Sequence, residues 1–289
     1  MPENLRAIRR KIKTVQSIGK ITRAMKMVAA AKLRRAQGQV DAGRVYWDAL
    51  AQLIGHVADC AEELSHPFLQ PGPGETDAVL VIGGSRGLCG SYNVSLLRHA
   101  LQSVSSLKPR PRLMTVGPKA QQFLSKRGWA IEKAFGVPEE SERLQMATDV
   151  AAGLRELFLS GQVGTIHVVF TEFYSAIRHR PLTRQLLPVQ AAEMHDKNGG
   201  GIGDYIFEPA AEQLLGGLLP RAVDAAVYRM LLESAAAEEG ARMAAMTAAT
   251  DNADEMTTTL KRDLNRARQS QITTELLEVV SGAEALESG

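Results

Sequence analysis

The fold is first indicated by the stretch LRRAQGQVDAGRVYWDALAQLIGHVADCAEEL, residues 33–64. Apolar and small residues recur in it with alternating steps of three and four, which is the heptad seam of a coiled coil. The seam positions are Leu33, Ala36, Val40, Gly43, Trp47, Leu50, Ile54, Val57, Ala61 and Leu64. Ser65, His66 and Pro67 then end the helix, and PGPGE at 71–75 predicts a linker.

The same periodicity extends to the N-terminus, with one irregularity. The seam positions before the irregularity are Leu5, Ile8, Ile12 and Val15, and those after it are Ile18, Ile21, Met25 and Val28. The extra step of three between the two sets predicts a stammer, which locally overwinds a coiled coil. At 1.5 Å per residue this helix would be about 90 Å long, which a compact domain of this size does not require.

A second long helix is predicted at the C-terminal end. Its seam runs through Val223, Val227, Met230, Ser234, Ala237, Ala241, Ala244 and Ala248, and resumes at Ile272, Leu276, Val279, Ala283 and Leu286. Alanine fills nine of the nineteen positions 235–253, so a neighbouring backbone can approach this helix closely. Gly216, Gly217 and Pro220 predict a kink or break near its beginning.

The middle of the chain has a different pattern, in which strands alternate with helices. Strands are predicted at 77–82, 112–116, 165–173 and 183–189, and helices at 93–107, from 118 onward and at 141–159. This alternation is typical of an α/β domain with a parallel or mixed sheet. The sequence NGGGIGD at 198–204 predicts a flexible loop.

The predicted fold class is therefore α/β plus a long antiparallel coiled coil. An N-terminal helix (1–64) and a C-terminal helix with its tip (209–289) form the coiled-coil shaft, and a Rossmann-like α/β domain (76–208) is inserted between them. If residue 64 lies beside about 209, residue 25 lies beside about 248 and residue 1 beside about 272. The last seventeen or so residues would then extend past the pair as a single helix.

Charge is divided unevenly along the chain. Residues 1–44 hold twelve lysines and arginines against two acids, although the whole chain has 34 basic and 32 acidic residues. The remainder therefore has 22 basic and 30 acidic residues (34 − 12 and 32 − 2), and residues 233–289 hold eleven acids against five bases. This distribution favours pairing between the two terminal helices, although GKITRAMKMVAAAKLRRA at 19–36 could alternatively bind nucleic acid.

Several classes of site receive no support from the sequence. Cys60 and Cys89 lie in unrelated contexts, and the six histidines form no ligand pair at helical spacing, so no metal site or cofactor is predicted. No apolar run approaches the roughly 18 residues needed to cross a bilayer, and the N-terminus lacks the apolar core of a signal peptide. The pair Glu238–Glu239 is interpreted as part of a solvated helix face.

The turn GGSRGLCGSYN at 83–93 follows a strand and precedes a helix, which is where phosphate-binding loops lie. Its candidate residues are Arg86, Gly87, Leu88, Cys89 and Gly90. The glycine spacing matches neither the dinucleotide fingerprint nor a Walker A loop, and residues 101–112 contain no acid that could bind a ribose. A structural turn or a protein contact is favoured, and an α/β nucleotide-binding enzyme is the alternative.

The C-terminal stretch ITTELLEVVSGAEAL at 272–286 is apolar around most of the helix. Leu276, Val279 and Val280 belong to this apolar tip. A single helix does not leave such a surface in water without a reason. The alternatives are a frayed tail, a contact between two copies of the chain, and a tip held in an apolar sleeve formed by another protein.

Four separated motifs resemble the γ subunit of F-type ATP synthase, and together they span nearly the whole chain. They are KITRAMKMVAAAKLRRAQ near the N-terminus, RGLCG at 86–90, ARMAAMTAATDNA at 241–253 and NRARQSQITTELLEVVSGAEAL at 265–286. The resemblance implies a central rotor stalk that couples ion flow through a c-ring to ATP synthesis or hydrolysis in the β subunits. It implies no active site in this chain, and as partners the α and β subunits, the ε subunit and the c-ring.

The resemblance also implies roles for single residues. Met25 matches the residue that faces the acidic loop of a β subunit, and the implied coupling residues of the C-terminal helix are Arg242, Arg268, Gln269, Thr273 and Glu275. Ser85 and Ser91 depart from the family pattern, which usually has an acid and a glycine there. Membrane association would be indirect, through the c-ring, at the cytoplasmic side of the cell inner (plasma) membrane.

Overall fold

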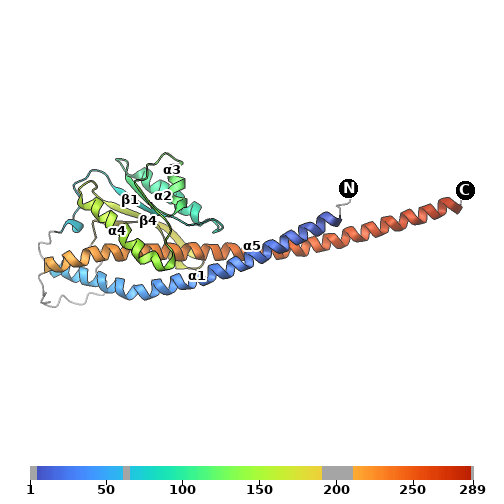
Figure 1. Ribbon diagram of the computed structural model, residues 1–289, viewed down its shortest axis with the longest axis horizontal. Coiled ribbons are helices and arrows are strands. Elements are labelled where there is room, and N and C mark those ends of the chain that lie inside the picture. The colour runs from blue at the N-terminus through green and yellow to red at the C-terminus, as the bar shows by residue number, and fades with distance from the viewer. Residues whose placement is uncertain (1–4, 61–65, 191–210, 288–289) are drawn as a thin grey trace. The chain divides into compact units, whose positions relative to one another are not determined.

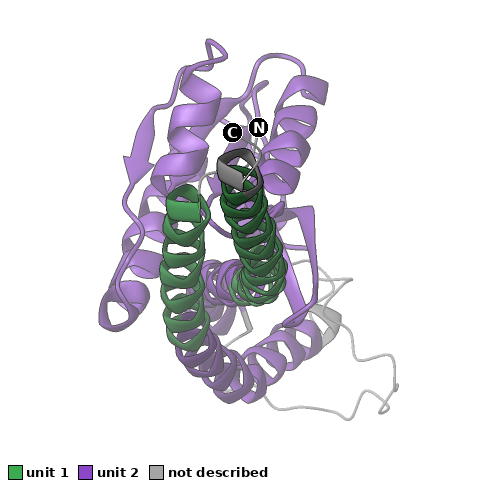
Figure 2. Cartoon of the chain, turned by 90° about the vertical axis from the view of Figure 1, so that its right-hand side faces the viewer, with its two compact units in different colours: residues 1–28, 243–289 green, residues 29–242 purple. Residues whose placement is uncertain are grey.

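The computed structural model describes residues 5–60, 66–190 and 211–287, so the predicted loop at 198–204 lies outside the described residues. The chain divides into two compact units, residues 1–28 with 243–289 and residues 29–242 (Figure 2). Two long helices, α1 (Leu5–Cys60) and α5 (Ala211–Glu287), run through both units. The predicted pair of long terminal helices is therefore confirmed, and each unit is described below by itself.

The unit formed by residues 29–242 contains a five-stranded mixed sheet. Its strands are β1 (Ala78–Ile82), β2 (Arg112–Val116), β3 (Lys133–Phe135), β4 (Ile166–Ser175) and β5 (Arg178–Leu187). Their spatial order is β3-β2-β1-β4-β5, in which β5 alone is antiparallel to its neighbour. The helices around it are α2 (Tyr92–Ser106), α3 (Pro118–Ser125) and α4 (Arg143–Leu159), with short 3-10 turns at Pro67–Leu69 and Glu140–Glu142 (Figure 1).

The predicted strands and helices of this unit are confirmed, with small differences at their ends. β2 has the predicted bounds, whereas β5 begins five residues before the expected strand at 183–189 and ends at Leu187. The edge strand β3 was not predicted, because three residues with two exposed side chains show no apolar period.

Within this unit, one apolar core joins α1, α5, α4 and one face of the sheet. Trp47, Leu50 and Ile54 of α1 belong to it, as predicted from the heptad of residues 33–57. Gly43 is required at its seam position because a Cβ there would lie 2.6 Å from the Trp47 ring. The stretch of α5 that contributes to this core is therefore held by α1 and by the α/β elements (Figure 1).

Of the kink or break predicted near Pro220, the break is wrong, because α5 continues through the proline. Leu219 and Val223 are buried on either side of the proline, and the Arg155 guanidinium bonds the Pro220 carbonyl at 3.1 Å as well as the Asp224 carboxylate. Packing and these bonds hold the backbone in the helical path, although proline cannot donate the usual helical hydrogen bond.

The unit formed by residues 1–28 and 243–289 contains an antiparallel pair of helices. The hydroxyl oxygens of Thr22 and Thr250 lie 2.9 Å apart, and each lies within 3.2 Å of a carbonyl in its own helix. In an antiparallel helix pair, the residue numbers of facing positions have a nearly constant sum. This sum is 272 for Thr22 and Thr250, and it is 273 for the predicted pair of residues 25 and 248. The antiparallel pairing and its register are therefore confirmed.

The predicted stammer in α1 is wrong. Ile18, Ile21 and Val28 are 48%, 59% and 57% exposed, whereas Gly19 and Thr22 are buried. The side chains turned inward are Ile8, Ile12, Val15, Gly19 and Thr22, which keep an uninterrupted alternation of four and three. A Cβ on Gly19 would lie only 3.3 Å from the Ala253 Cβ, so this contact selects a residue for its small size and not for its hydrophobicity.

The seam predicted for the facing part of α5 is also wrong at two positions. Ala244 and Ala248 are exposed, and the buried positions are Met246, Thr250 and Ala253. Where alanine occupies every side of a helix, the sequence gives no amphipathic direction, so small differences in contact decide which face is buried.

Candidate functional site: the turn after β1 and the helix shaft

The turn between β1 and α2 contains the candidate residues predicted from the glycine-rich sequence at 83–93. Arg86, Gly87, Leu88 and Gly90 are exposed, whereas Cys89 is 2% exposed. Leu88 and Gly90 both have positive φ angles, of 60° and 56°, which is the left-handed conformation that turns the chain back toward α2. The turn therefore presents Leu88 outward and buries the thiol.

The turn is bound to α5 through the carboxylate of Glu238, a residue that is 6% exposed. Ser85 donates to it from its backbone nitrogen at 3.1 and 3.2 Å and from its hydroxyl at 2.7 Å, and the Arg86 nitrogen donates at 3.3 Å. On the other side, the Arg242 guanidinium donates to the same carboxylate at 2.5 Å. Ser85, Arg86, Glu238 and Arg242 are called the Glu238 cluster below.

The Glu238 cluster overturns the interpretation of Glu238–Glu239 as a solvated face. Glu238 is buried and fully engaged, and Glu239 also binds Arg242, at 2.7 Å. Burial alone would lower the pKa of Arg242, but its hydrogen bonds and charge pairing with Glu238 and Glu239 outweigh this effect and raise the pKa. The spacing of four between Glu238 and Arg242 could have indicated the ion pair, but the sequence shows no sign of the contact with residues 85 and 86.

The same cluster bears on the nucleotide-binding alternative. In dinucleotide-binding folds, backbone nitrogens of the turn after the first strand bind a phosphate. Here the Ser85 and Arg86 nitrogens bind the protein's own carboxylate. An anion from solution would have to displace Glu238 from an arginine and a buried position, so the turn functions as an internal contact.

Cys89 and Tyr92 lie directly behind this turn. Burial, and secondly the charge of Glu238, raise the pKa of the Cys89 thiol, so the nucleophilic thiolate is disfavoured. Burial likewise raises the pKa of Tyr92, whose hydroxyl donates to the Ser234 carbonyl of α5 at 3.2 Å. Both side chains are therefore buried parts of the core and not exposed reactive groups.

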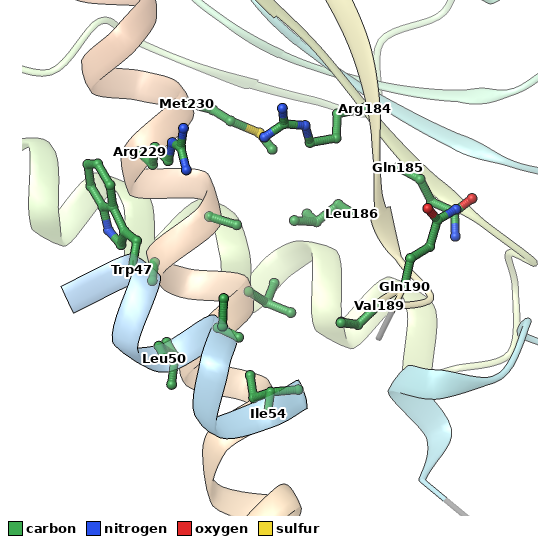
Figure 3. A pocket seen from close by; sticks show the side chains of 15 residues that line it. Trp47, Leu50, Ile54, Arg184, Gln185, Leu186, Val189, Gln190, Arg229 and Met230 are labelled. Carbon is green, nitrogen blue, oxygen red and sulfur yellow. The ribbon is translucent and has the colours of Figure 1, made fainter. Parts of the chain in front are cut away.

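A hollow of about 310 Å³ lies between α1, the end of β5 and α5 within residues 29–242 (Figure 3). Apolar side chains such as Leu50, Ile54 and Met230 line it together with Arg184 and Arg229. No carboxylate, imidazole, thiol or hydroxyl is among its lining residues in the described part of the chain. The hollow therefore offers no general base or nucleophile from a side chain.

The basic stretch of α1 is paired less extensively than its charge suggests. Arg23 pairs with Asp254 at 2.8 Å, which is the expected contact with the second helix, whereas Arg35 pairs with Glu140 at 3.4 Å. In the ranges that the structure describes, Lys20, Lys26 and Lys32 take part in no ion pair. Their charge is available to a partner outside this chain.

The residues implied as coupling residues fall in both units. Met25 is half-buried on α1, and Arg268, Gln269, Thr273 and Glu275 are all exposed on α5. Arg242 differs from them because Glu238 and Glu239 already bind its guanidinium. The apolar tip residues Leu276, Val279 and Val280 are 61%, 70% and 53% exposed, so nothing in the described part of this chain covers them.

The described residues show neither a membrane-spanning helix nor a cluster of metal ligands. None of the helices that the structure describes has the length and hydropathy needed to span a bilayer. Likewise, the described histidines, cysteines and acids form no group of three that could hold a metal ion.

Comparisons with known proteins decide the family. A family model described as "ATP synthase" matches residues 4–286. The chain is 41% identical to the ATP synthase gamma chain of Desulforamulus reducens over 282 residues, covering 98% of this chain and 99% of the relative. The chain belongs to the ATP synthase gamma-chain family. The ATP synthase gamma chain of an Anaeromyxobacter species is 43% identical, with the same coverage of both chains.

Solved structures agree on the fold of this family member. A chain of the Euglena gracilis mitochondrial ATP synthase (OSCP, F1 and c-ring) matches with a TM-score of 0.68 and 18% identity, covering 99% of this chain and 95% of that one. A chain from the central stalk and c-ring of the Tetrahymena thermophila enzyme matches with a TM-score of 0.59 and 22% identity, covering 79% and 99%. The predicted fold class and the resemblance to this family are both confirmed.

Proposed function

We propose that this chain is the central rotor stalk subunit of an F-type ATP synthase, coupling ion flow through a c-ring to ATP synthesis or hydrolysis in the β subunits. Similarity to gamma chains over 98% of the sequence is the observation that carries the proposal. The antiparallel helix pair of residues 1–28 and 243–289, joined at Thr22 and Thr250, supports it because a shaft needs a fixed register.

Three parts of the chain have separate tasks in this proposal. The N-terminal helix (1–64) and the C-terminal helix with its tip (209–289) form the shaft, and the α/β domain (76–208) forms the foot that contacts the ε subunit and the c-ring. The exposed tip with Leu276, Val279 and Val280 turns inside the α and β subunits, where an apolar sleeve covers it.

Catalysis belongs to the β subunits in this proposal, and the chain itself has no active site and needs no cofactor. It transmits a mechanical state, because different faces of an asymmetric shaft contact the three β subunits and shift their affinities for ADP and ATP. The chain is held peripherally, on the cytoplasmic side of the inner (plasma) membrane, through the c-ring.

The first test is assembly and rotation. The full chain is co-expressed with the α, β and ε subunits of its own organism, and a bead is attached to the α/β domain. ATP should drive rotation of the bead in the purified complex. A chain that stays separate from α and β, or that binds ATP tightly on its own, would contradict the proposal.

A substitution in the shaft tests coupling. Met25→Lys adds a charge on the side that, by family resemblance, faces the acidic loop of β, so ion pumping should fall more than ATP hydrolysis. Both rates are measured in membrane vesicles that contain the assembled complex. Met27→Lys is the control, because Met27 lies on another side of the same helix and is 64% exposed. Equal losses of pumping and hydrolysis in Met25→Lys would exclude a coupling role.

A further inference from the structure

The contacts that hold α5 change in character along residues 211–242. The buried side chains of the first part are mostly large and apolar, including Leu215, Leu219, Val227, Met230 and Leu232, although Arg155 also binds Pro220 and Asp224 there. From Ser234 onward the buried side chains are mostly small or polar: Ser234, Ala236, Ala237, Glu238, Ala241 and Arg242. Apolar burial itself has no preferred direction, whereas a hydrogen bond has one, so hydrogen bonds in this second part define the rotational setting of the helix more sharply.

In the second part, directional bonds to α2, β4 and the turn after β1 accompany these small side chains. The Tyr92 hydroxyl donates to the Ser234 carbonyl at 3.2 Å, and the Thr171 nitrogen lies 3.4 Å from the Ser234 hydroxyl. Glu238 makes the strongest set, because an ionised carboxylate accepts the Ser85 and Arg86 donors at the end of β1. The Arg242 guanidinium forms an ion pair with the same carboxylate, and Arg242 is the last residue of the compact unit 29–242.

We propose that the Glu238 cluster is the joint that carries torque between the α/β domain and the shaft helix. This proposal rests on the proposed rotor function. Glu238 is a positioning residue in it: its carboxylate fixes the rotational setting of α5 against the turn after β1, where small side chains alone would permit movement. The joint lies within the last turn of α5 before that compact unit ends.

The chemistry of the joint provides a direct test. Glu238→Ala removes the carboxylate but leaves the Ser85 N–H and O–H, the Arg86 N–H and the Arg242 guanidinium around the vacated space. These donors form an anion site of the size of a small carboxylate. Acetate from solution should occupy it, whereas acetamide, which has the same shape and no charge, should not.

The first measurement is hydrogen exchange at the Ser85 and Arg86 amides in the full isolated chain. Glu238→Ala should accelerate their exchange by about tenfold or more, since both amides lose a charged acceptor. Sodium acetate should slow the exchange again, relative to sodium chloride at the same ionic strength. Glu239→Ala is the matched control, because Glu239 binds Arg242 but forms no hydrogen bond or ion pair with the described residues of the turn. The proposed joint would be wrong if Glu238→Ala left the exchange rates unchanged, or if sodium chloride slowed exchange in this variant as much as sodium acetate.

A second pair of variants applies if Glu238→Ala does not fold. Glu238→Gln keeps the shape and removes the charge, and Ser85→Ala removes the hydroxyl donor that lies 2.7 Å from the carboxylate. Both should accelerate exchange at Arg86 less than Glu238→Ala would. Exchange at Arg86 that stays at the unmodified rate in both variants would overturn the joint.

The second measurement concerns torque in the assembled complex. With the rotor stalled and a bead on the α/β domain, the angular variance of the bead reports torsional stiffness. Glu238→Ala should raise this variance and acetate should lower it again. Glu239→Ala leaves the bonds between Glu238 and the turn in place, so it should change the variance much less. Raised exchange with unchanged variance would overturn the torque role. Failure of the unmodified chain to assemble would instead overturn the proposed function, while the exchange data would still decide whether the joint exists.

Discussion

The two helix pairs of this molecule have the same heptad periodicity but differ in the side chains that fill the middle of the seam. In the unit of residues 29–242, the pair buries Trp47, Leu50 and Ile54 with Val227 and Met230 in a core shared with the sheet. In the unit of residues 1–28 and 243–289, the seam residues in the middle of the pair are small or hydroxylated. The first pair is stabilised mainly by buried apolar area. In the second, large apolar contacts remain at Ile8 and Met246, and close approach and hydroxyl groups replace them in the middle of the seam.

This difference suits the proposed tasks of the two units. Small residues such as Gly19 and Ala253 keep the helix pair thin, and the hydrogen-bonded Thr22 and Thr250 fix its register. Thin packing also leaves Ile18, Ile21 and Val28 on the outside of α1, where they are available to other subunits. The cost is a smaller buried area, so the unit of residues 1–28 and 243–289 should be the less stable of the two.

The largest effect should follow from removing apolar volume in the unit of residues 29–242. Ile54 is fully buried, so Ile54→Ala should lower the free energy of unfolding by about 2–5 kcal/mol through lost contacts and a cavity. Urea denaturation of the isolated chain measures this change. Leu53→Ala is the control, because Leu53 is 51% exposed and should change stability by less than about 0.5 kcal/mol. Equal effects of the two substitutions would contradict the assignment of the buried face.

A smaller effect should follow from adding volume to the thin helix pair. Gly19→Leu places a side chain where even a Cβ would lie 3.3 Å from Ala253, and should destabilise residues 1–28 and 243–289 by about 1–3 kcal/mol. Gly38→Leu is the matched control, since a Cβ at Gly38 meets no atom within 4 Å and the helix gains up to about 1 kcal/mol in propensity. Hydrogen exchange resolved along α1 would distinguish the two. Stabilisation by Gly19→Leu would show that the pair is not closely packed.

The sequence predicted the first helix pair and not the details of the second, for a physical reason. Between residues 33 and 57 the seam consists mostly of large apolar residues, and hydrophobicity alone identifies them. At 18–28 the largest apolar side chains face outward, so the same rule selected the wrong face. A contact chosen for small size leaves no hydrophobic signal, although the antiparallel register could still be derived from helix geometry alone.

The candidate site divides in the same way. Residues 86–90 were found because a glycine-rich turn between a strand and a helix is a local pattern. Glu238 was missed because its partners at 85 and 86 are 153 and 152 positions away, and a glutamate in an alanine-rich helix resembles a solvated one. The outward positions of Arg268, Gln269, Thr273 and Glu275 agree with contacts to other chains, which the sequence of this chain alone does not specify.

A change of pH should act on the two units unequally. Burial lowers the pKa of His66, His99, His167 and His179, in His167 against the opposing charge of Asp77, and in His99 with help from Arg180. Their unfolded value is 6.5, so the unfolded chain binds more protons below it. The stability due to these neutral imidazoles is complete above pH 6.5 and is lost as the pH falls toward the lower folded values.

The measurement is exchange-detected stability of each unit between about pH 7.5 and 5.5, in the range where histidine titrates. Residues 29–242 should lose stability on acidification, whereas residues 1–28 and 243–289 contain no histidine and should change less. The double variant His167→Gln, His179→Gln should flatten the pH dependence of residues 29–242. An equal loss in both units, unaffected by this variant, would assign the acid effect to groups other than histidine.

The smallest effect in the isolated chain should occur at the tip of α5. Leu276 and Val280 are 61% and 53% exposed, so Leu276→Ala and Val280→Ala should change the free energy of unfolding by less than about 0.5 kcal/mol. In the assembled complex, however, an apolar sleeve would bury each side chain, which contributes about 1.5–3 kcal/mol when complete. The same substitutions should therefore weaken binding to the α and β subunits. Thr274→Ala is the control, because its hydroxyl only bonds the Ser270 carbonyl of its own helix.

Hydrogen exchange of residues 273–287 separates the two states of the tip. The segment should exchange fast in the free chain, because no described residue of this chain covers residues 273–283, and slowly in the complex. Removing the last few residues should weaken assembly moderately and leave part of the torque, since the helix pair bound through Thr22 and Thr250 still pushes on β. Slow exchange in the free chain would mean that the tip folds back on its own protein, and the sleeve would then be excluded. Fast exchange in both states would mean that the complex leaves these apolar side chains in water. This result would also contradict the sleeve, because such an exposed apolar surface is unfavourable.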